Sequence, residues 1–213
     1  MTLESVVKEV GRQFGCEASA QFAPLSNLKV KWRKSSDKIE FIFSDYLEEA
    51  PEDSIRWVTT CMLDQIYNDT PIPGDTKTFF PMCFTREFAD KHKATWIARN
   101  GCTMDNDWIW DIVNIAKEHD PSLEIPEDIT LVSCMAKPES MNYTGVMVTV
   151  CFRTVAVYNN LVNATNEEKV IIGTIICTKA HLKDADLFEV AEDIYGFEKG
   201  QRLARKISKR IMR

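Results

Sequence analysis

The chain repeats one order of structural signals, and this repeat constrains the fold more than any other feature. The first copy occupies residues 28–67 and the second occupies residues 129–182. Each copy has extended segments, then a turn with acidic residues, and then an apolar helix. The two copies are offset by about 100 residues, which is the size of a small domain. The pattern therefore predicts two similar units.

Hydrophobic spacing assigns the elements of the first half. Residues 2–14, 51–67 and 84–99 have helical spacing, and residues 28–32 and 38–44 read as two strands joined by a polar turn. A loop with three prolines separates the second and third helices.

The second half follows the same order. Residues 107–119, 166–182 and 185–197 have helical spacing, and residues 129–136 and 146–159 are rich in β-forming side chains. Together the two halves predict an α+β protein in which each half contains a helix, a small β-sheet and a helix pair.

The domain boundary is expected at residues 100–106. The first domain would then span 1–102 and the second 103–213. We expect the halves to pack as a pseudo-dimer, because a lone unit of about 100 residues exposes much of its apolar surface.

Composition indicates an ordinary globular protein, with 45% hydrophobic and 27% charged residues. The longest apolar run, residues 170–177, is far shorter than the roughly 20 residues that cross a bilayer. No cationic leader is visible, so we expect no membrane span and a cytoplasmic protein. The seven cysteines form no C-x-x-C pair, and most are expected to be buried thiols.

Basic residues are concentrated in residues 199–213. This segment has seven Lys and Arg residues and no acid, so with a net charge of −6 for the whole chain the remaining residues carry −13. Leu203, Ile207 and Ile211 form an apolar seam along the same helix. Its candidate anion-binding residues are Arg202, Arg205, Lys206, Lys209 and Arg210. We expect the helix to lie against the acidic body of the chain, in preference to binding nucleic acid or an anionic membrane.

Both copies of the repeat contain pieces of a known pattern. The first copy has Trp32, Ser35-Ser36, the strand at 39–43, Ala50-Pro51-Glu52 and the helical segment 61–65. The second has residues 154–161, Asn166-Glu167-Glu168 and the helical segment 177–181. These pieces resemble the core of the SprT/YgjP/WLM group of zinc metallopeptidases, in which W-G-S-C, a strand and an A-P-E-E turn precede an H-E-L-x-H helix. The resemblance implies two zincin-like halves.

The catalytic signature of that family is absent from the first half. The resemblance places Cys61 and Gln65 at the two helix ligands and Met62 at the glutamate that takes a proton from the zinc-bound water. Gln is a poor zinc ligand and Met cannot accept a proton. We therefore assign no catalytic residue.

The second half retains more of the ligand pattern. Cys177 and His181 keep the i, i+4 spacing, and the resemblance places the third ligand at Asp184. Thr178 replaces the glutamate, so the usual hydrolysis would be lost even with zinc bound. The simpler interpretation is that Cys177 is a core residue and His181 a surface residue.

The sequence therefore favours a catalytically inactive, metallopeptidase-like protein that binds or scaffolds an unknown protein partner, without a cofactor. One alternative is a divergent metal-dependent hydrolase that uses Cys177, His181 and Asp184. The other is an anion- or nucleic-acid-binding accessory protein that acts through residues 199–213. Serine hydrolase, P-loop and dinucleotide-binding signatures are not found in the sequence.

Overall fold

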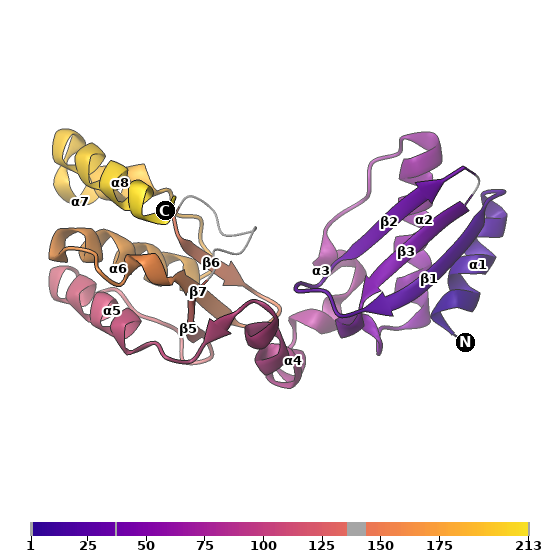
Figure 1. Ribbon diagram of the computed structural model, residues 1–213, viewed down its shortest axis with the longest axis horizontal. Coiled ribbons are helices and arrows are strands. Elements are labelled where there is room, and N and C mark those ends of the chain that lie inside the picture. Colours follow the sequence, from indigo (N-terminus) through magenta and orange to yellow (C-terminus); the bar gives the residue numbers. More distant parts are fainter. Residues whose placement is uncertain (1, 37, 136–143, 213) are drawn as a thin grey trace. The chain divides into compact units, whose positions relative to one another are not determined.

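The computed structural model describes residues 2–36, 38–135 and 144–212 and confirms the mixed α+β class (Figure 1). The chain forms two compact units, Met1–His92 and Lys93–Arg213. The division falls within one helix, and the boundary expected at residues 100–106 lies in the second unit. No helix in the described part of the chain is long and apolar enough to cross a bilayer.

Unit 1 contains a three-stranded sheet. Its elements are α1 (Leu3–Gln13), β1 (Glu17–Ala23), β2 (Val30–Ser35), β3 (Lys38–Ser44), the 3-10 turn η1 (Asp45–Leu47), α2 (Glu52–Asn68), α3 (Thr76–Phe79) and η2 (Pro81–Phe84), followed by the start of α4 (Arg86–Arg99). The strand order is β1-β3-β2, with β1 parallel and β2 antiparallel to β3.

One face of this sheet carries the core of unit 1. Ile39, Phe41 and Phe43 alternate along β3 and are fully buried. Their partners are the apolar faces of α1 and α2, which lie behind the sheet in Figure 1. Because strand side chains alternate, Lys38, Glu40 and Ile42 point to the opposite face.

Unit 2 contains a four-stranded sheet. It comprises the end of α4, β4 (Cys102–Thr103), α5 (Asp107–His119), β5 (Thr130–Cys134), β6 (Val146–Thr149), β7 (Thr154–Tyr158), η3 (Asn159–Leu161), α6 (Asn166–Ala180), α7 (Leu187–Tyr195) and α8 (Phe197–Ile211). The strand order is β4-β5-β7-β6, with β5 parallel and β6 antiparallel to β7.

The core of unit 2 lies between this sheet and its helices. Leu131, Val155 and Val157 belong to one cluster with apolar residues of α5, α6, α7 and α8. Helices α5 and α6 approach closely at Gly173, where a Cβ would lie 2.5 Å from Ala116 Cβ. Elsewhere in the unit Trp96 of α4 is fully buried and stacks on Phe152.

Most expected elements are present, and the short α3, η2 and β4 are additions to them. The sequence pattern missed β1, whose small and polar side chains give weak alternation. The segment 146–159 is two strands, because Arg153 takes a positive φ of 46° and the chain turns there. The last residue of the strand expected at 129–136 lies outside the described residues.

The expectation for the cysteines needs one correction. Cys102 and Cys134 are directly opposite each other on β4 and β5 and form a disulfide. Cys83 and Cys177 are buried thiols, as expected, whereas Cys16, Cys61 and Cys151 are partly exposed. The pairing was missed because the two residues are 32 positions apart, and only the register of β4 against β5 brings them together.

Candidate functional site

An open apolar groove of about 270 Å³ lies beside α2 in unit 1. We call it the β2–α2 groove and define it by lining residues from β2, α2 and the segment 69–80. These are Val30, Val58, Met62, Ile72, Phe79 and Phe80. Leu47, Lys29 and Asp75 also line it. The groove is thus mostly apolar, with one basic and one acidic side chain at its margin.

Strand β2 is an edge strand beside this groove. The Ser44 N–H donates to the Lys29 carbonyl, and paired residues alternate in an antiparallel ladder. The backbone groups of Val30, Trp32 and Lys34 therefore point away from β3. Within the part of the chain that the structure describes, no backbone hydrogen bond joins this outer edge to another segment.

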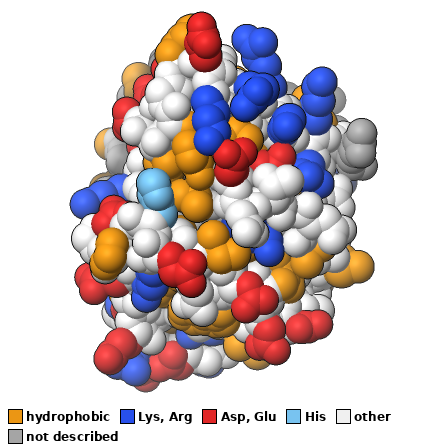
Figure 2. Space-filling view, turned by 90° about the vertical axis from the view of Figure 1, so that its left-hand side faces the viewer, with side chains coloured by type: hydrophobic (Ala, Val, Ile, Leu, Met, Phe, Trp, Pro, Cys, Tyr) orange, Lys and Arg blue, Asp and Glu red, His pale blue; other side chains and the backbone are white. Residues whose placement is uncertain are grey.

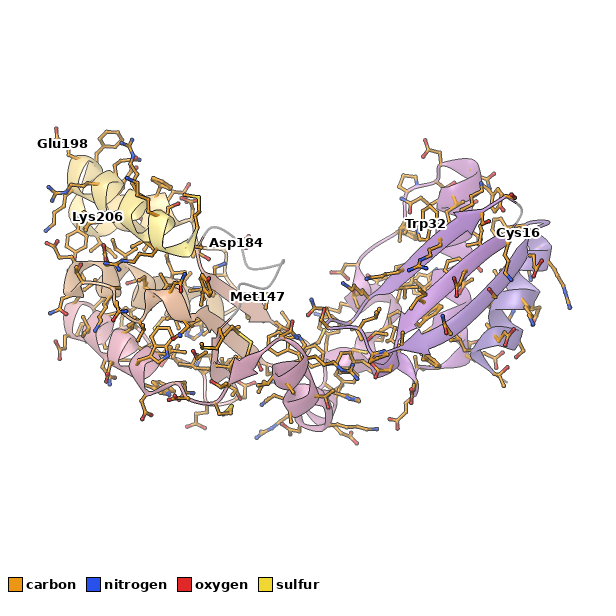
Figure 3. All side chains as sticks on the ribbon, viewed as in Figure 1. Cys16, Trp32, Met147, Asp184, Glu198 and Lys206 are labelled. Carbon is orange, nitrogen blue, oxygen red and sulfur yellow. A yellow bond between two sulfur atoms is a disulfide. The ribbon has the colours of Figure 1, made fainter. Side chains whose placement is uncertain are left out.

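Exposed aromatic and basic side chains lie on the elements that form the groove. Trp32 on β2 (Figure 3) and Trp57 on α2 are each 44% exposed. Trp57 packs against Phe79 with a ring separation of 4.7 Å. Lys34 of β2 is also exposed and lies on the same face of the sheet as Trp32. An apolar surface with neighbouring aromatic and cationic groups is suited to a partner that brings apolar and acidic side chains.

The structural register shows which residues of unit 2 correspond to this groove. Turns η1 and η3 start 114 positions apart, at Asp45 and Asn159, and so do helices α2 and α6. The backbone hydrogen bonds extend the correspondence to the preceding strand, where the offset is 116 because the hairpin of unit 2 is two residues longer. Ser44 N–H donates to Lys29 O, and Tyr158 N–H donates to Gly145 O.

In unit 2 the corresponding place is filled by α8. Gly145 and Leu161 correspond to Lys29 and Leu47 of the groove. A Cβ on Gly145 would lie 3.0 Å from Ile211 Cγ1 and 3.0 Å from Leu161 Cδ1. Ile211 therefore occupies the space that in unit 1 is open. The counterparts of Val58 and Met62 are isoleucines 172 and 176, which are fully buried.

The register can also be applied to Cys61, Met62 and Gln65, the residues of unit 1 that the resemblance places at the zinc ligands and the general base. Met62 lines the groove, but Cys61 and Gln65 do not. Burial and the nearby Asp64 carboxylate raise the pKa of the Cys61 thiol, so its metal-binding thiolate form is disfavoured. The structural counterpart of Cys61 in unit 2 is residue 175. The metallopeptidase-like pattern of the sequence aligns Cys61 with Cys177 instead. Two residues is more than half a turn of helix, so the two sets of aligned residues do not face equivalent directions.

Cys177 and His181 line one pocket of about 300 Å³ at the end of α6, together with Glu124. His181 Nε2 is 3.9 Å from Glu124 Oε1. Burial raises the pKa of Cys177 to about 11. Asp184 is exposed in the connection between α6 and α7 (Figure 3) and does not line the pocket.

Across residues 2–36, 38–135 and 144–212, no three His, Cys, Asp or Glu side chains are grouped so that they could hold a metal ion. The zinc site at Cys177, His181 and Asp184 therefore stays a prediction. Of its three residues, Cys177 and His181 line the same pocket.

The candidate anion-binding residues divide into two groups. Arg210 pairs with Glu168 of α6, next to the pair that Lys199, which is not a candidate, forms with Glu167. Glu168 is only 1% exposed, and Arg210 donates to it through Nε and Nη2 at 3.1 and 3.0 Å. The other four candidates are exposed and form no ion pair with a described residue. They are Arg202, Arg205, Lys206 and Lys209.

Comparison of the chain with models of protein families, with curated proteins and with solved structures finds no match. The function therefore has to be argued from the geometry. Sequence reasoning missed the β2–α2 groove, because its lining comes from four separate segments. The sequence did contain one indication of this difference between the units. The apolar seam of Leu203, Ile207 and Ile211 indicates a helix that packs on an apolar surface of the second half.

Proposed function

We propose that this chain is a non-catalytic, metallopeptidase-like binding protein formed by duplication, and that its β2–α2 groove binds an apolar helical segment of a protein partner. The observation that carries the proposal is the position of α8. In unit 2 the corresponding place is filled by an amphipathic helix, and in unit 1 the same framework leaves it open. A helix seated in an apolar groove is a common mode of peptide recognition.

The duplication is supported by the shared element order and strand pairing of the two units. In each, a helix and a parallel strand precede an antiparallel edge strand, a central strand, a 3-10 turn and a long helix. The absence of catalysis is supported by the chemistry of Met62. It lines the groove at the position that the family gives to a general base, and a thioether takes up no proton at neutral pH.

The groove also indicates the chemistry of the partner. Its apolar lining suits a helix with Ile or Leu at every fourth position, like the seam of α8. Lys29, which lines the groove, and the exposed Lys34, which lies on the same face of β2 as Val30, favour acidic residues flanking that stripe. We therefore expect an amphipathic, acidic helix, and a basic one should bind less well.

A synthetic peptide tests this proposal. The peptide has the sequence of residues 197–212 with every Lys and Arg replaced by Glu, which keeps the apolar seam and reverses the charge. Isothermal titration calorimetry on the full chain should show saturable one-to-one binding. The variant Met62→Gln/Ile72→Gln should weaken binding by at least about tenfold, since removing buried apolar contacts costs about 1.5–3 kcal/mol each.

Two controls make the test specific. Ile42→Gln changes a half-buried isoleucine on the opposite face of the same sheet and should leave the affinity unchanged. The unmodified basic peptide should bind more weakly than the acidic one. Equal weakening by Ile42→Gln, or no heat of binding with either peptide, would refute the groove as a docking site.

A further inference from the structure

The exposed side of α8 carries four cations that the groove does not explain. Arg202, Arg205, Lys206 and Lys209 follow the spacing i, i+3, i+4, i+7, which places them on one face of the helix. At 1.5 Å per residue this basic stripe is about 10 Å long. Figure 2 shows Lys and Arg side chains gathered at the top of the view, the height at which α7 and α8 lie in Figure 1.

The stripe is not needed to hold α8 in place. Leu203, Ile207 and Ile211 on the opposite side of the helix are buried in the core of unit 2. The inner cations Lys199 and Arg210 already neutralise the acidic first turn of α6. Acidic residue Glu198 stands in the first turn of α8, where the helix dipole favours a negative charge. The four outer cations form no ion pair in the described structure, and only Arg202 and Lys206 attract an internal carboxylate, that of Glu167, at longer range.

We propose that the basic stripe of α8 contacts the phosphate backbone of a double-stranded nucleic acid. The stripe consists only of cations, which suit phosphate contacts, and it lacks the Asn, Gln and carboxylate side chains that read adenine and cytosine. It lies on the second helix of a tightly turned pair, because α7 and α8 are joined at Gly196, which has a φ of 76°. A helix presented in this way has the width that the major groove of DNA admits.

Other polyanions fit the stripe less well. Single strands are held by aromatic side chains on which bases stack, and none lies on the stripe. Membrane-surface helices insert apolar side chains next to their cations. Phe197 and Met212 are exposed, but at about 100° per residue they point roughly 130° and 70° away from the centre of the stripe. The apolar seam itself is buried and cannot insert.

Fluorescence anisotropy of the full chain with labelled 20-base-pair DNA and RNA duplexes tests the proposal. Four phosphate contacts predict that log K falls with log salt with a slope of about −3.6, a loss of roughly 100-fold between 50 and 200 mM salt. The variant Arg205→Gln/Lys209→Gln should reduce the slope by about 2. Both side chains are exposed, so the variant should fold normally. The DNA and RNA arms show which duplex is preferred.

The control variant is Lys31→Gln/Arg33→Gln, which removes two exposed cations from β2 and should leave duplex binding unchanged. Equal weakening by both variants would show a non-specific charge effect and overturn the proposal. So would the absence of duplex binding at 50 mM salt. Tighter binding to a single strand of the same length, or to vesicles with 30% phosphatidylserine, would also overturn it, because the partner would then be of another class.

Discussion

At the scale of single residues, the thiol of Cys177 has a pKa that burial strongly shifts. It is 1% exposed, and burial raises its pKa to about 11 from the ordinary value of 9.0. The neutral thiol is therefore the form that the fold stabilises. A thiolate, which is the form that binds zinc, would first have to overcome this cost.

This shift predicts a pH-dependent stability. The unfolded chain ionises near the ordinary thiol pKa and the folded chain only near pH 11, so the contribution of Cys177 is fully present below about pH 8.5 and is lost as the pH rises toward 11. Urea denaturation at pH 8 and pH 10 measures the effect. The Cys177→Ala variant should lose less stability over this interval than the parent chain. An identical loss in both proteins would show that the thiol is not the titrating group.

At the scale of secondary-structure elements, the junction of α6 and α8 depends on one buried carboxylate. Glu168 accepts from the Thr165 N–H in a capping box and from the guanidinium of Arg210. A buried carboxylate needs all of its partners, because an unsatisfied charge in a core is costly. The amphipathic pattern of α8 was visible in the sequence. Which of its cations pairs with the buried Glu168 was not, because that depends on how α8 packs against α6.

Removal of that cation should therefore cost stability. Arg210→Ala leaves Glu168 buried with its cap alone, and since Arg210 is partly exposed, water replaces some of the contact. We expect a loss of about 1–3 kcal/mol in the free energy of unfolding, measured by urea denaturation. Lys209→Ala, one position away on the exposed stripe, should change it by less than about 0.5 kcal/mol. A similar loss in both variants would contradict the pairing.

The same scale shows what could be predicted from the sequence. The long helices α2, α5 and α6 were predicted to within two residues at each end, because apolar spacing over three or more turns is a strong signal. Strand β1 and the break at Arg153 were missed. Both depend on pairing with distant strands, which local composition does not encode. The groove was missed for the same reason.

At the scale of the whole molecule, the question is whether any metal is resident. The resemblance led to a three-ligand set, and the structure brings together only Cys177 and His181 of that set. A structural zinc site needs four ligands, and a catalytic site needs three with an open position. The available pair, with one thiol held neutral, would bind zinc weakly.

We therefore expect purified protein to contain far less than one zinc per chain by elemental analysis. Added zinc or EDTA should leave the melting temperature unchanged, because a metal that binds only the folded state would raise it. The Cys177→Ala variant is the matched control. Stoichiometric zinc in the parent chain that disappears in this variant would reinstate the divergent hydrolase hypothesis.

Ile211 packs against Gly145, so the C-terminal helix α8 covers part of the core of unit 2. A chain truncated before Leu203 would expose the isoleucines of α6 to water. We expect such a product to aggregate or to be degraded, so that a loss of duplex binding could not be measured separately. Trimming of this tail would thus act on the lifetime of the protein.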